Sequence, residues 1–470
     1  MSIIGTSRSE LVHQAKHFTV EALCSGKTAE AIEQALRVTG RSEQRSSPLQ
    51  PKLAMWLVLC MPIFRSDSIP AVLARLVNGL RELVTALSLR PVTDGAIAHS
   101  RRKLGVEPVK EFYRLQANQI RPAPSFHGLC VWAFDGSLLT MPDTKANRRR
   151  FGAVKPSRGR SAFPQMKVVG LQDVASRGLR DVRFDSWKAG ERMMALPMLD
   201  HLGEGDLVLL DRGFYAAWFF EAIRLQRSHF LCRVSAFVKF DALPETSKES
   251  GDYLAFIEAP VELPKKQRYT NSRGIHVKNR TVRMLVRVLE YRIGGFERVR
   301  LVTSLLDRSI TALDLVLQYH RRWEIELALD ELKTHQSSTA SGTLKTIFRG
   351  LSPRAVMQEA YALVASYNLI RGLIKEASDR HRIDPDKISL VDSLRAVALM
   401  APRMRSAPSH RLPALYNQLL ADIAESLIDR PRRGRRYPRV VKQKMSNFKL
   451  KRPRHKQVLI DFKSSIRIGA

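Results

Sequence analysis

The spacing of the apolar residues changes near residue 128, and this change constrains the fold more than any other feature of the sequence. Before it, apolar residues recur every three or four positions, as in Ile69, Val72 and Leu76, which is the period of an amphipathic helix. After it, apolar runs rich in β-branched and aromatic residues are typical of strands. We therefore predict a helical N-terminal domain over residues 1–120 and a strand-rich core beyond it.

Strand-like and helix-like segments follow a defined order through residues 121–234, the first part of the core. Three successive strand-like runs predict an antiparallel sheet, at residues 129–134, 166–171 and 179–184. A helix, a buried strand, a second helix and a further strand come next, at residues 191–202, 206–210, 216–225 and 230–234. The order β-β-β-α-β-α-β is ribonuclease-H-like, a mixed sheet flanked by helices, so the predicted fold class is mixed α/β.

Three further regions follow this part of the core. Residues 235–310 start with a polar segment and continue with alternating strands at 281–291 and 299–304, which predicts a β-rich insertion. The helical period returns over residues 311–400, the second part of the core, beginning with one helix from residue 312 to 335. Residues 401–470 form a basic, helical and flexible C-terminal region that contains the acid-free stretch RPRRGRRYPRVVKQKMSNFKLKRPRHK.

The charge of the chain predicts a polyanionic partner. Lys and Arg number 78 and Asp and Glu 45, a formal net charge of +33, while hydrophobic residues at 44% still allow a core. Cations that neutralise phosphates release bound counterions, so nucleic acid is the partner that we expect. Charge alone leaves open a ribosome-associated protein or an anionic membrane surface.

Other features of the composition exclude several classes of protein. The four cysteines are scattered without CxxC pairs, which argues against a zinc site or a disulfide framework and predicts buried small side chains. The N-terminus lacks a leader pattern, and the apolar run at residues 53–64 is too short to span a bilayer. We therefore expect a cytoplasmic protein.

The stretch TDGAIAHSRRKLG, at residues 93–105, predicts a short basic helix in the N-terminal domain. Thr93 is a suitable N-cap, and His99 and three basic residues follow on the helix. This helix fits a helix-turn-helix, but a surface helix with a solvated basic face explains it equally well.

Two acids in the core are candidates for chemistry. Asp135 follows the apolar run LCVWAF, and Asp211 ends the more apolar run DLVLLD. Carboxylates on rigid core strands can converge on divalent cations, which prefer oxygen ligands. Each acid taken singly is explained as well by a cap in a turn.

A third acid lies on the helix predicted from residue 312 to 335. Tyr319, Arg322, Glu326 and Lys333 fall on one face at about 100° per residue. Spacing alone favours an exposed ladder of salt bridges for these residues. Trp323 beside this face is predicted to be packed.

The pattern Tyr-x2-Arg-x3-Glu-x6-Lys, with the two core acids, resembles that of the DDE transposases of bacterial insertion sequences, specifically the insertion sequence 4 family. Further stretches resemble the same family: FDGSLLTMPDT, LVLLDRGFY, LVTSLLD, WLVLCMPIFRSDSI and YPRVVKQKMSNFKLKR. The resemblance covers most of the chain from about Arg41 onward, and it implies the ribonuclease-H-like core and the β-rich insertion. It also implies that the partner is double-stranded DNA, at the transposon ends and in the target, and that the protein is bacterial and associates with the nucleoid.

The resemblance also implies the roles of the site residues. Three acids would be catalytic and would hold two Mg²⁺ ions, which Mn²⁺ can replace: Asp135, Asp211 and Glu326. Three residues would bind DNA phosphates near the cut end: Tyr319, Arg322 and Lys333. The implied reaction is hydrolysis at the ends of the element, followed by attack of the freed 3′-hydroxyl on a phosphodiester, in a homodimer that holds both ends in a synaptic complex.

The sequence departs from some members of this family at two points. Some have an extra Lys where this chain has Asp330, and some have a Trp in the insertion that holds a flipped base, whereas this insertion contains none. A hairpin intermediate is therefore not implied. Two other functions stay open, a ribonuclease-H-like nuclease without strand transfer and an inactive DNA-binding relative.

Overall fold

The protein is described by a computed structural model that covers residues 26–42, 49–65, 67–80, 92–120, 122–153, 163–243, 250–260, 281–293, 298–335, 348–428, 439–440, 449–450 and 463–469. The chain divides into two compact units. The first unit comprises Met1–Ser125, Cys130–His201 and Trp323–Leu427, and the second comprises Phe126–Leu129, Leu202–Arg322 and Ile428–Ala470. Most of the basic C-terminal stretch lies outside the described residues, as does Cys24.

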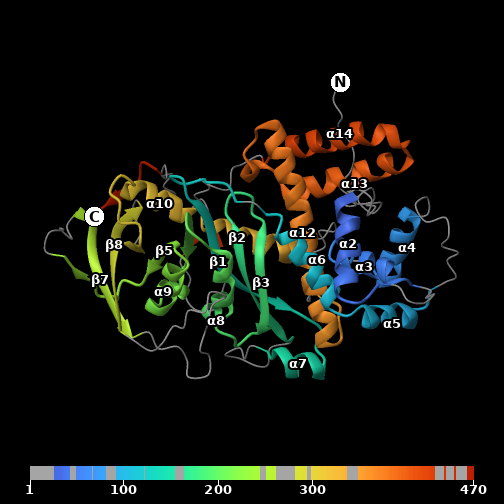
Figure 1. The fold of residues 1–470 in the computed structure, drawn as a ribbon, viewed down its shortest axis with the longest axis horizontal. Helices are drawn as coiled ribbons and strands as arrows, with labels where there is room; N and C mark the ends of the chain where they lie inside the picture. Colours follow the sequence, from blue (N-terminus) through green and yellow to red (C-terminus); the bar gives the residue numbers. More distant parts are fainter. Residues whose placement is uncertain are drawn as a thin grey trace. The chain divides into compact units, whose positions relative to one another are not determined.

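Helices form the N-terminal part of the first unit, as predicted (Figure 1). They are α2 (Gly26–Val38), α3 (Pro51–Cys60), α4 (Ile69–Leu80), α5 (Asp94–Leu104) and α6 (Glu107–Ala117). Every residue of α3 from Leu53 to Cys60 is buried, so this apolar run is a core helix. No helix in the described part of the chain combines the length and the apolar character needed to cross a membrane.

The 29-residue helix α12 (Pro353–His381) is the central element of the first unit. Its apolar positions pack against α3 and α6, which joins the N-terminal helices to the later part of the chain. Two further helices pack against α12: α13 (Leu390–Ser406) and α14 (Leu412–Glu425).

An antiparallel sheet completes the first unit, in the order β3-β2-β1. Its strands are β1 (Cys130–Thr140), β2 (Gln165–Asp173) and β3 (Leu179–Ser186). The predicted antiparallel strands are confirmed, but β1 continues past its apolar run, so Asp135 lies within the strand rather than at its end. The helix α7 (Lys145–Phe151) follows β1, and α8 (Glu191–Ala195) gives way to a 3-10 helix (Leu196–His201), because Pro197 cannot donate the backbone hydrogen bond of an α-helix.

The second unit is built on a mixed sheet in the order β4-β5-β9-β8-β7-β6. The parallel strands β4 (Asp206–Leu210) and β5 (His229–Val234) are joined by α9 (Ala217–Leu225), which packs against the sheet. The predicted strands of the insertion are present as β8 (Thr281–Ile293) and β9 (Val299–Thr303), and they extend the sheet from β5. Three other strands complete it: β6 (Asp241–Ala242), β7 (Asp252–Pro260) and β12 (Ile466–Ile468).

The single helix predicted from residue 312 to 335 is wrong, because three segments replace it. The helix α10 (Ala312–His320) belongs to the second unit and ends in a turn at Arg321 and Arg322. In the first unit, α11 (Trp323–Asp330) passes into a π-helical turn (Glu331–His335). The turn and the wider π-helical winding change the angle between successive side chains, so the four-residue pattern does not follow one helical face. Trp323 is 54% exposed, so the prediction that this side chain is packed is wrong.

Candidate active site

Asp135 lies in β1, opposite Gly170 of β2. Its side chain is partly exposed, and its Oδ1 accepts a hydrogen bond from the backbone N–H of Gly136 at 2.8 Å. A Cβ atom added at Gly136 would lie 2.8 Å from the carboxylate of Glu191, which also pairs with Lys167 at 3.5 Å. Because side chains alternate along a strand, Glu191 packs on the face of β1 opposite to Asp135. Sequence reasoning did not find this packing, for which no motif gives a signal.

The helix that carries Glu326 packs against the strand that carries Asp135. Ile325, the residue before Glu326, is fully buried, and its Cδ1 lies 3.9 Å from the position of a Cβ atom added at Gly170. Gly170 in turn is the strand partner of Asp135. The first and third predicted acids are therefore carried by directly packed elements of the same unit, and both side chains are partly exposed.

Lys333 lies in the π-helical turn after α11 and is partly exposed. Burial lowers the pKa of Lys333, while the negative charges of Asp330 and Asp135 act in the opposite direction. The charge of Asp135 therefore acts on Lys333 within the first unit.

Two hydrogen bonds from the N-terminal helical region fix the turn that carries Lys333. The buried Arg65 donates from Nη1 to the carbonyl oxygen of Lys333 at 2.7 Å, and from Nη2 to that of Leu332 at 2.5 Å. These carbonyls belong to the last turn of the helix that the structure describes, and Arg65 supplies a donor to each of them. Arg65 was not predicted to act at the site, because its partners are backbone atoms that no sequence pattern reveals.

A buried cluster of charges anchors α11 from its other side. Arg177, in the turn between β2 and β3, forms an ion pair with Glu324 and lies 3.8 Å from Glu331 and 3.1 Å from Asp386. Arg371 of α12 also pairs with Glu331. Glu324 and Glu331 thus bind the two ends of α11 to the body of the unit, with Glu326 between them.

In the second unit, Asp211 directly follows β4, as predicted. Its Oδ1 accepts a hydrogen bond from the backbone N–H of Gly213 at 2.8 Å, so the side chain caps a short 3-10 helix (Arg212–Phe214). The side chain is partly exposed, although β4 before it is almost entirely buried. Asp211 is therefore a cap in a turn, which was the alternative explanation of this acid from the sequence. The capping hydrogen bond also orients the carboxylate.

Tyr319 and Arg322 are buried, which excludes an exposed ladder of salt bridges for this part of the pattern. The guanidinium carbon of Arg322 lies 6.0 Å from the centre of the Tyr319 ring. Burial raises the pKa of the Cys232 thiol, the charge of Asp211 raises it further and that of Arg322 lowers it. Asp211 and Arg322 therefore act on the same thiol within the second unit.

The donor atoms of the three acids suit a hard divalent cation, because partly exposed carboxylates offer oxygen ligands. Asp135 and Glu326 belong to the first unit and Asp211 to the second. Among the described residues, no three His, Cys, Asp or Glu side chains lie close enough together to hold a metal ion. The convergence of the three acids stays a prediction.

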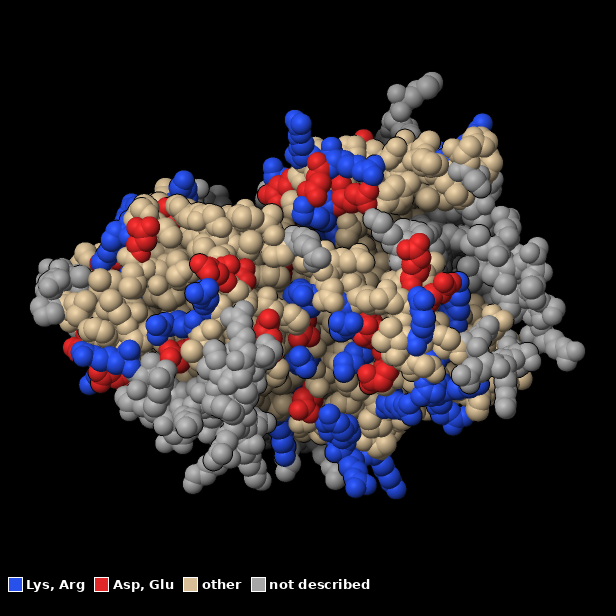
Figure 2. All heavy atoms as spheres, viewed as in Figure 1, with Lys and Arg blue, Asp and Glu red and all other residues tan. Residues whose placement is uncertain are grey.

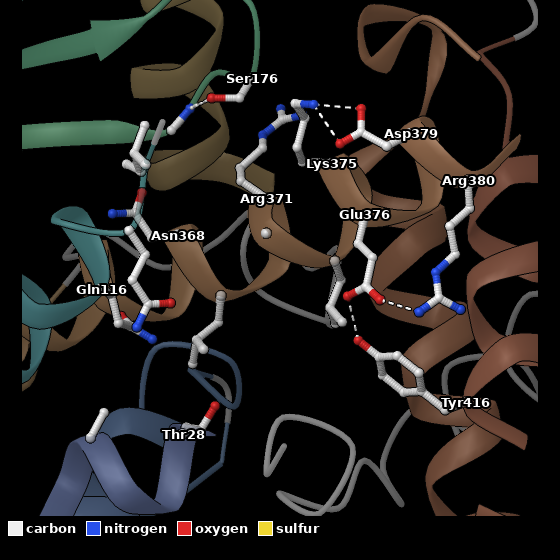
Figure 3. A pocket seen from close by; sticks show the side chains of 17 residues that line it. Thr28, Gln116, Ser176, Asn368, Arg371, Lys375, Glu376, Asp379, Arg380 and Tyr416 are labelled. Atoms are coloured by element: carbon white, nitrogen blue, oxygen red, sulfur yellow. Dashed lines mark hydrogen bonds and ion pairs between the residues drawn. The ribbon is translucent and has the colours of Figure 1, made fainter. Parts of the chain in front are cut away.

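A cavity of about 530 Å³ lies elsewhere in the first unit, among α2, α6, α12 and α14 (Figure 3). Four of its charged side chains pair with one another, Lys375 with Asp379 and Glu376 with Arg380, and Glu376 also accepts a hydrogen bond from Tyr416. None of the predicted site residues lines it. The cavity is therefore separate from the candidate active site.

Two family models match the chain. The model described as insertion element 4 transposase N-terminal matches residues 18–114, and that described as transposase DDE domain matches residues 127–369. The chain belongs to the insertion sequence 4 family of DDE transposases. This confirms the resemblance found in the sequence, and with it the mixed α/β fold with a ribonuclease-H-like core.

Curated relatives agree with the family. The chain is 26% identical over 423 residues to the transposase InsG for insertion sequence element IS4 of Escherichia coli K12, covering 88% of this chain and 90% of the relative. It is also 26% identical over 193 residues to the putative transposase InsZ of the same organism, covering 40% of this chain and 62% of that relative. Among solved structures, a piggyBac transposase synaptic complex with hairpin DNA matches 88% of this chain and 85% of its own, with a TM-score of 0.40 and 10% identity.

The transposase is accordingly an enzyme of DDE-type phosphoryl transfer that binds DNA and depends on divalent metal ions. Its net charge of +33 agrees with a DNA substrate, because the phosphate backbone attracts a surplus of Lys and Arg.

Proposed function

We propose that the transposase binds the terminal inverted repeats of an insertion sequence, cleaves the DNA at the ends by metal-dependent hydrolysis and joins the 3′-hydroxyl ends to target DNA. One observation carries this proposal. The strand of Asp135 and the helix of Glu326 are packed together through Gly170 and Ile325. A rigid strand and helix hold two acids more precisely than loops would, as catalysis at a phosphodiester requires.

Asp135, Asp211 and Glu326 are the proposed ligands of two Mg²⁺ ions, which Mn²⁺ can replace. Bound ions would neutralise the charge of the phosphodiester and activate the attacking hydroxyl. The protein's own contribution is orientation. Gly213 holds one oxygen of Asp211, and Gly136 holds one oxygen of Asp135.

Tyr319, Arg322 and Lys333 are the proposed contacts to phosphates near the cut end. Arg322 is buried against Tyr319, which limits its rotamers and fixes the plane of its guanidinium fork for bidentate binding of an anion. Lys333 supplies a point charge, and burial disfavours that charge in the free protein. A bound phosphate would compensate for this penalty.

The regions read from the sequence are the proposed functional divisions of the chain. Residues 1–120 would bind the transposon end, residues 121–234 and 311–400 would form the catalytic core, and residues 235–310 would be its insertion. The family models support the first boundary, since one ends at residue 114 and the other begins at residue 127. The basic region at residues 401–470 would add phosphate contacts.

Two ends must be held together for joining, so we propose that a homodimer forms the synaptic complex at the bacterial nucleoid. The proposed reaction is tested by strand transfer with a duplex that carries a pre-cut end and a supercoiled target. Joined products with Mg²⁺ or Mn²⁺ are expected. Cleavage of intact ends without any joined product would instead indicate a nuclease that lacks strand transfer.

A further inference from the structure

Five exposed cations of the first unit come from three elements, and we call them the basic band: Arg102 and Lys103 of α5, Arg354 of α12, and Lys145 and Arg149 of α7. Figure 2 shows Lys and Arg side chains gathered along the lower edge of this view, over α5 and α7. Within the part of the chain that the structure describes, none of the five forms an ion pair.

The first turn of α12 links the two ends of the basic band. Gly105 ends α5 with a φ of +78°, and a Cβ atom added there would lie 2.9 Å from Nη2 of Arg354. On the other side, Thr144 donates from Oγ1 to the carbonyl oxygen of Leu351 at 3.0 Å, and Asn147 donates from Nδ2 to that of Gly350 at 3.1 Å. The α5 and α7 cations therefore belong to one continuous surface and not to two separate patches.

The α7 end of the basic band is rigid. Asn147 and Phe151 are fully buried and anchor the helix, while Lys145 and Arg149, four residues apart, project on one exposed face. The helix therefore presents both cations from a fixed backbone, so that only their side chains lose conformational entropy when they bind an anion.

Two acids beside α7 are already paired with other cations of the same helix. Asp143 accepts hydrogen bonds from Arg148, one of them at 2.7 Å, and Asp185 accepts one from Arg150 at 2.9 Å. The positive charge of Lys145 and Arg149 is therefore not compensated by these neighbours. A surface helix that is merely solvated would more commonly mix both signs of charge among its exposed side chains.

The position of α7 relative to Asp135 indicates that the polyanion bound by the basic band is the DNA held at the active site. Asp135 and the end of β1 at Thr140 are five residues apart on the strand, about 17 Å at the usual rise, and α7 begins at Lys145 shortly after. One turn of duplex DNA is about 34 Å long. A duplex held at Asp135 therefore extends far enough to reach α7.

We propose that the basic band binds the phosphodiester backbone of duplex DNA within about one helical turn of the bond cleaved at Asp135. The proposal rests on the proposed function, since it takes Asp135 as part of the active site. Phosphate contacts carry no sequence information, so the basic band would strengthen binding of any duplex, whether an inverted repeat or an unrelated sequence.

The test is the salt dependence of DNA binding by full-length variants, followed by fluorescence anisotropy with an inverted-repeat duplex and an unrelated duplex. Lys145→Gln/Arg149→Gln removes two band cations. The matched control, Arg382→Gln/Lys387→Gln, removes two exposed cations at and beyond the C-terminal end of α12. The slope of log affinity against log salt is expected to fall in magnitude by about 2 in the band variant, with both duplexes, and to stay unchanged in the control.

Two further arms make the result decisive. Arg149→Lys keeps the charge and is expected to keep the wild-type slope, whereas Arg149→Gln alone is expected to lower it by about 1. An unchanged slope in the band variant, or an equal fall in the control, would overturn the proposal while leaving wild-type cleavage and joining intact. Absence of cleavage by the wild-type protein would count against the proposed function instead.

Discussion

The guanidinium of Arg65 donates a hydrogen bond at 2.7 Å to the backbone carbonyl of Lys333, so a residue of the N-terminal helical region fixes the turn that bears a proposed phosphate contact. Burial lowers the pKa of Arg65 to about 10, and repulsion from Arg349 adds to the shift. Arg65 therefore keeps its charge at neutral pH. The arrangement makes the position of Lys333 depend on a part of the chain outside the catalytic core.

Arg65→Met is expected to destabilise the protein by about 1–3 kcal/mol, because the carbonyls of Leu332 and Lys333 each lose a hydrogen bond that is buried or partly buried. It is also expected to slow DNA cleavage at temperatures where the variant stays folded. Arg101→Met is the control, since it removes a buried ion pair with Glu359 in the same unit but touches no proposed site residue. Equal cleavage rates for the two variants would show that Arg65 has no role in positioning.

The three acids are expected to be required for chemistry but not for binding. Asp135→Ala, Asp211→Ala and Glu326→Ala are each expected to abolish cleavage of an inverted-repeat duplex in the presence of Mg²⁺. Binding of that duplex, measured by gel shift without metal, is expected to persist, because the loss of a carboxylate removes no phosphate contact. Wild-type cleavage by any one of the three variants would remove that acid from the site.

Lys333→Ala is expected to weaken binding of transposon ends and to reduce the salt slope by about 1, because one phosphate contact is lost. Lys333→Arg retains the charge and is expected to keep the slope. Lys387→Ala serves as a further control, since Lys387 is an exposed cation of the 3-10 helix beyond α12 and belongs neither to the proposed contacts nor to the basic band. If the slope of Lys333→Ala matched that of the wild type, Lys333 would have only a structural role.

The outline of the fold and the candidate site residues could be predicted from the sequence because both depend on local patterns. Apolar runs marked β1 to β5, and the spacing of Tyr319, Arg322 and Glu326 marked the family. The prediction of one continuous helix from residue 312 to 335 was wrong because tertiary contacts determine the conformation of this segment. Glu324 and Glu331 interact with Arg177, and Arg65 donates a hydrogen bond to the backbone carbonyl of Lys333. These partners lie far away in the sequence, so periodicity could not reveal them.

The buried charges around α11 predict a large loss of stability when one partner is removed. Arg177→Met leaves the buried Glu324 and the partly buried Asp386 without their shared cation, which is expected to cost about 3–5 kcal/mol in the free energy of unfolding. The double variant Arg177→Met/Glu324→Gln removes one stranded charge and is expected to recover part of this loss. Chemical denaturation of the two single variants and the double variant gives the coupling energy. Additive effects would contradict a direct interaction.

His320 predicts a pH dependence of stability. Burial lowers the pKa of His320 to about 4, and the charges of Arg233 and Arg322 add to the shift. The ordinary value in an unfolded chain is about 6.5. Between these two pKa values the unfolded state binds a proton at His320 and the folded state does not. The contribution of His320 to the free energy of unfolding is therefore fully present above a pH of about 6.5 and is lost as the pH falls towards 4.

His320→Gln removes this titration and preserves a polar group near the Tyr291 hydroxyl, which lies 3.2 Å from Nε2 of His320. The free energy of unfolding of the wild type is expected to fall more steeply than that of the variant between pH of about 6.5 and 4. Comparison of the two proteins cancels the titration of the carboxylates, which both share. Parallel curves would mean that His320 takes up its proton equally in the folded and unfolded states. They would contradict the conclusion that the imidazole beside Tyr319 and Arg322 is buried and neutral.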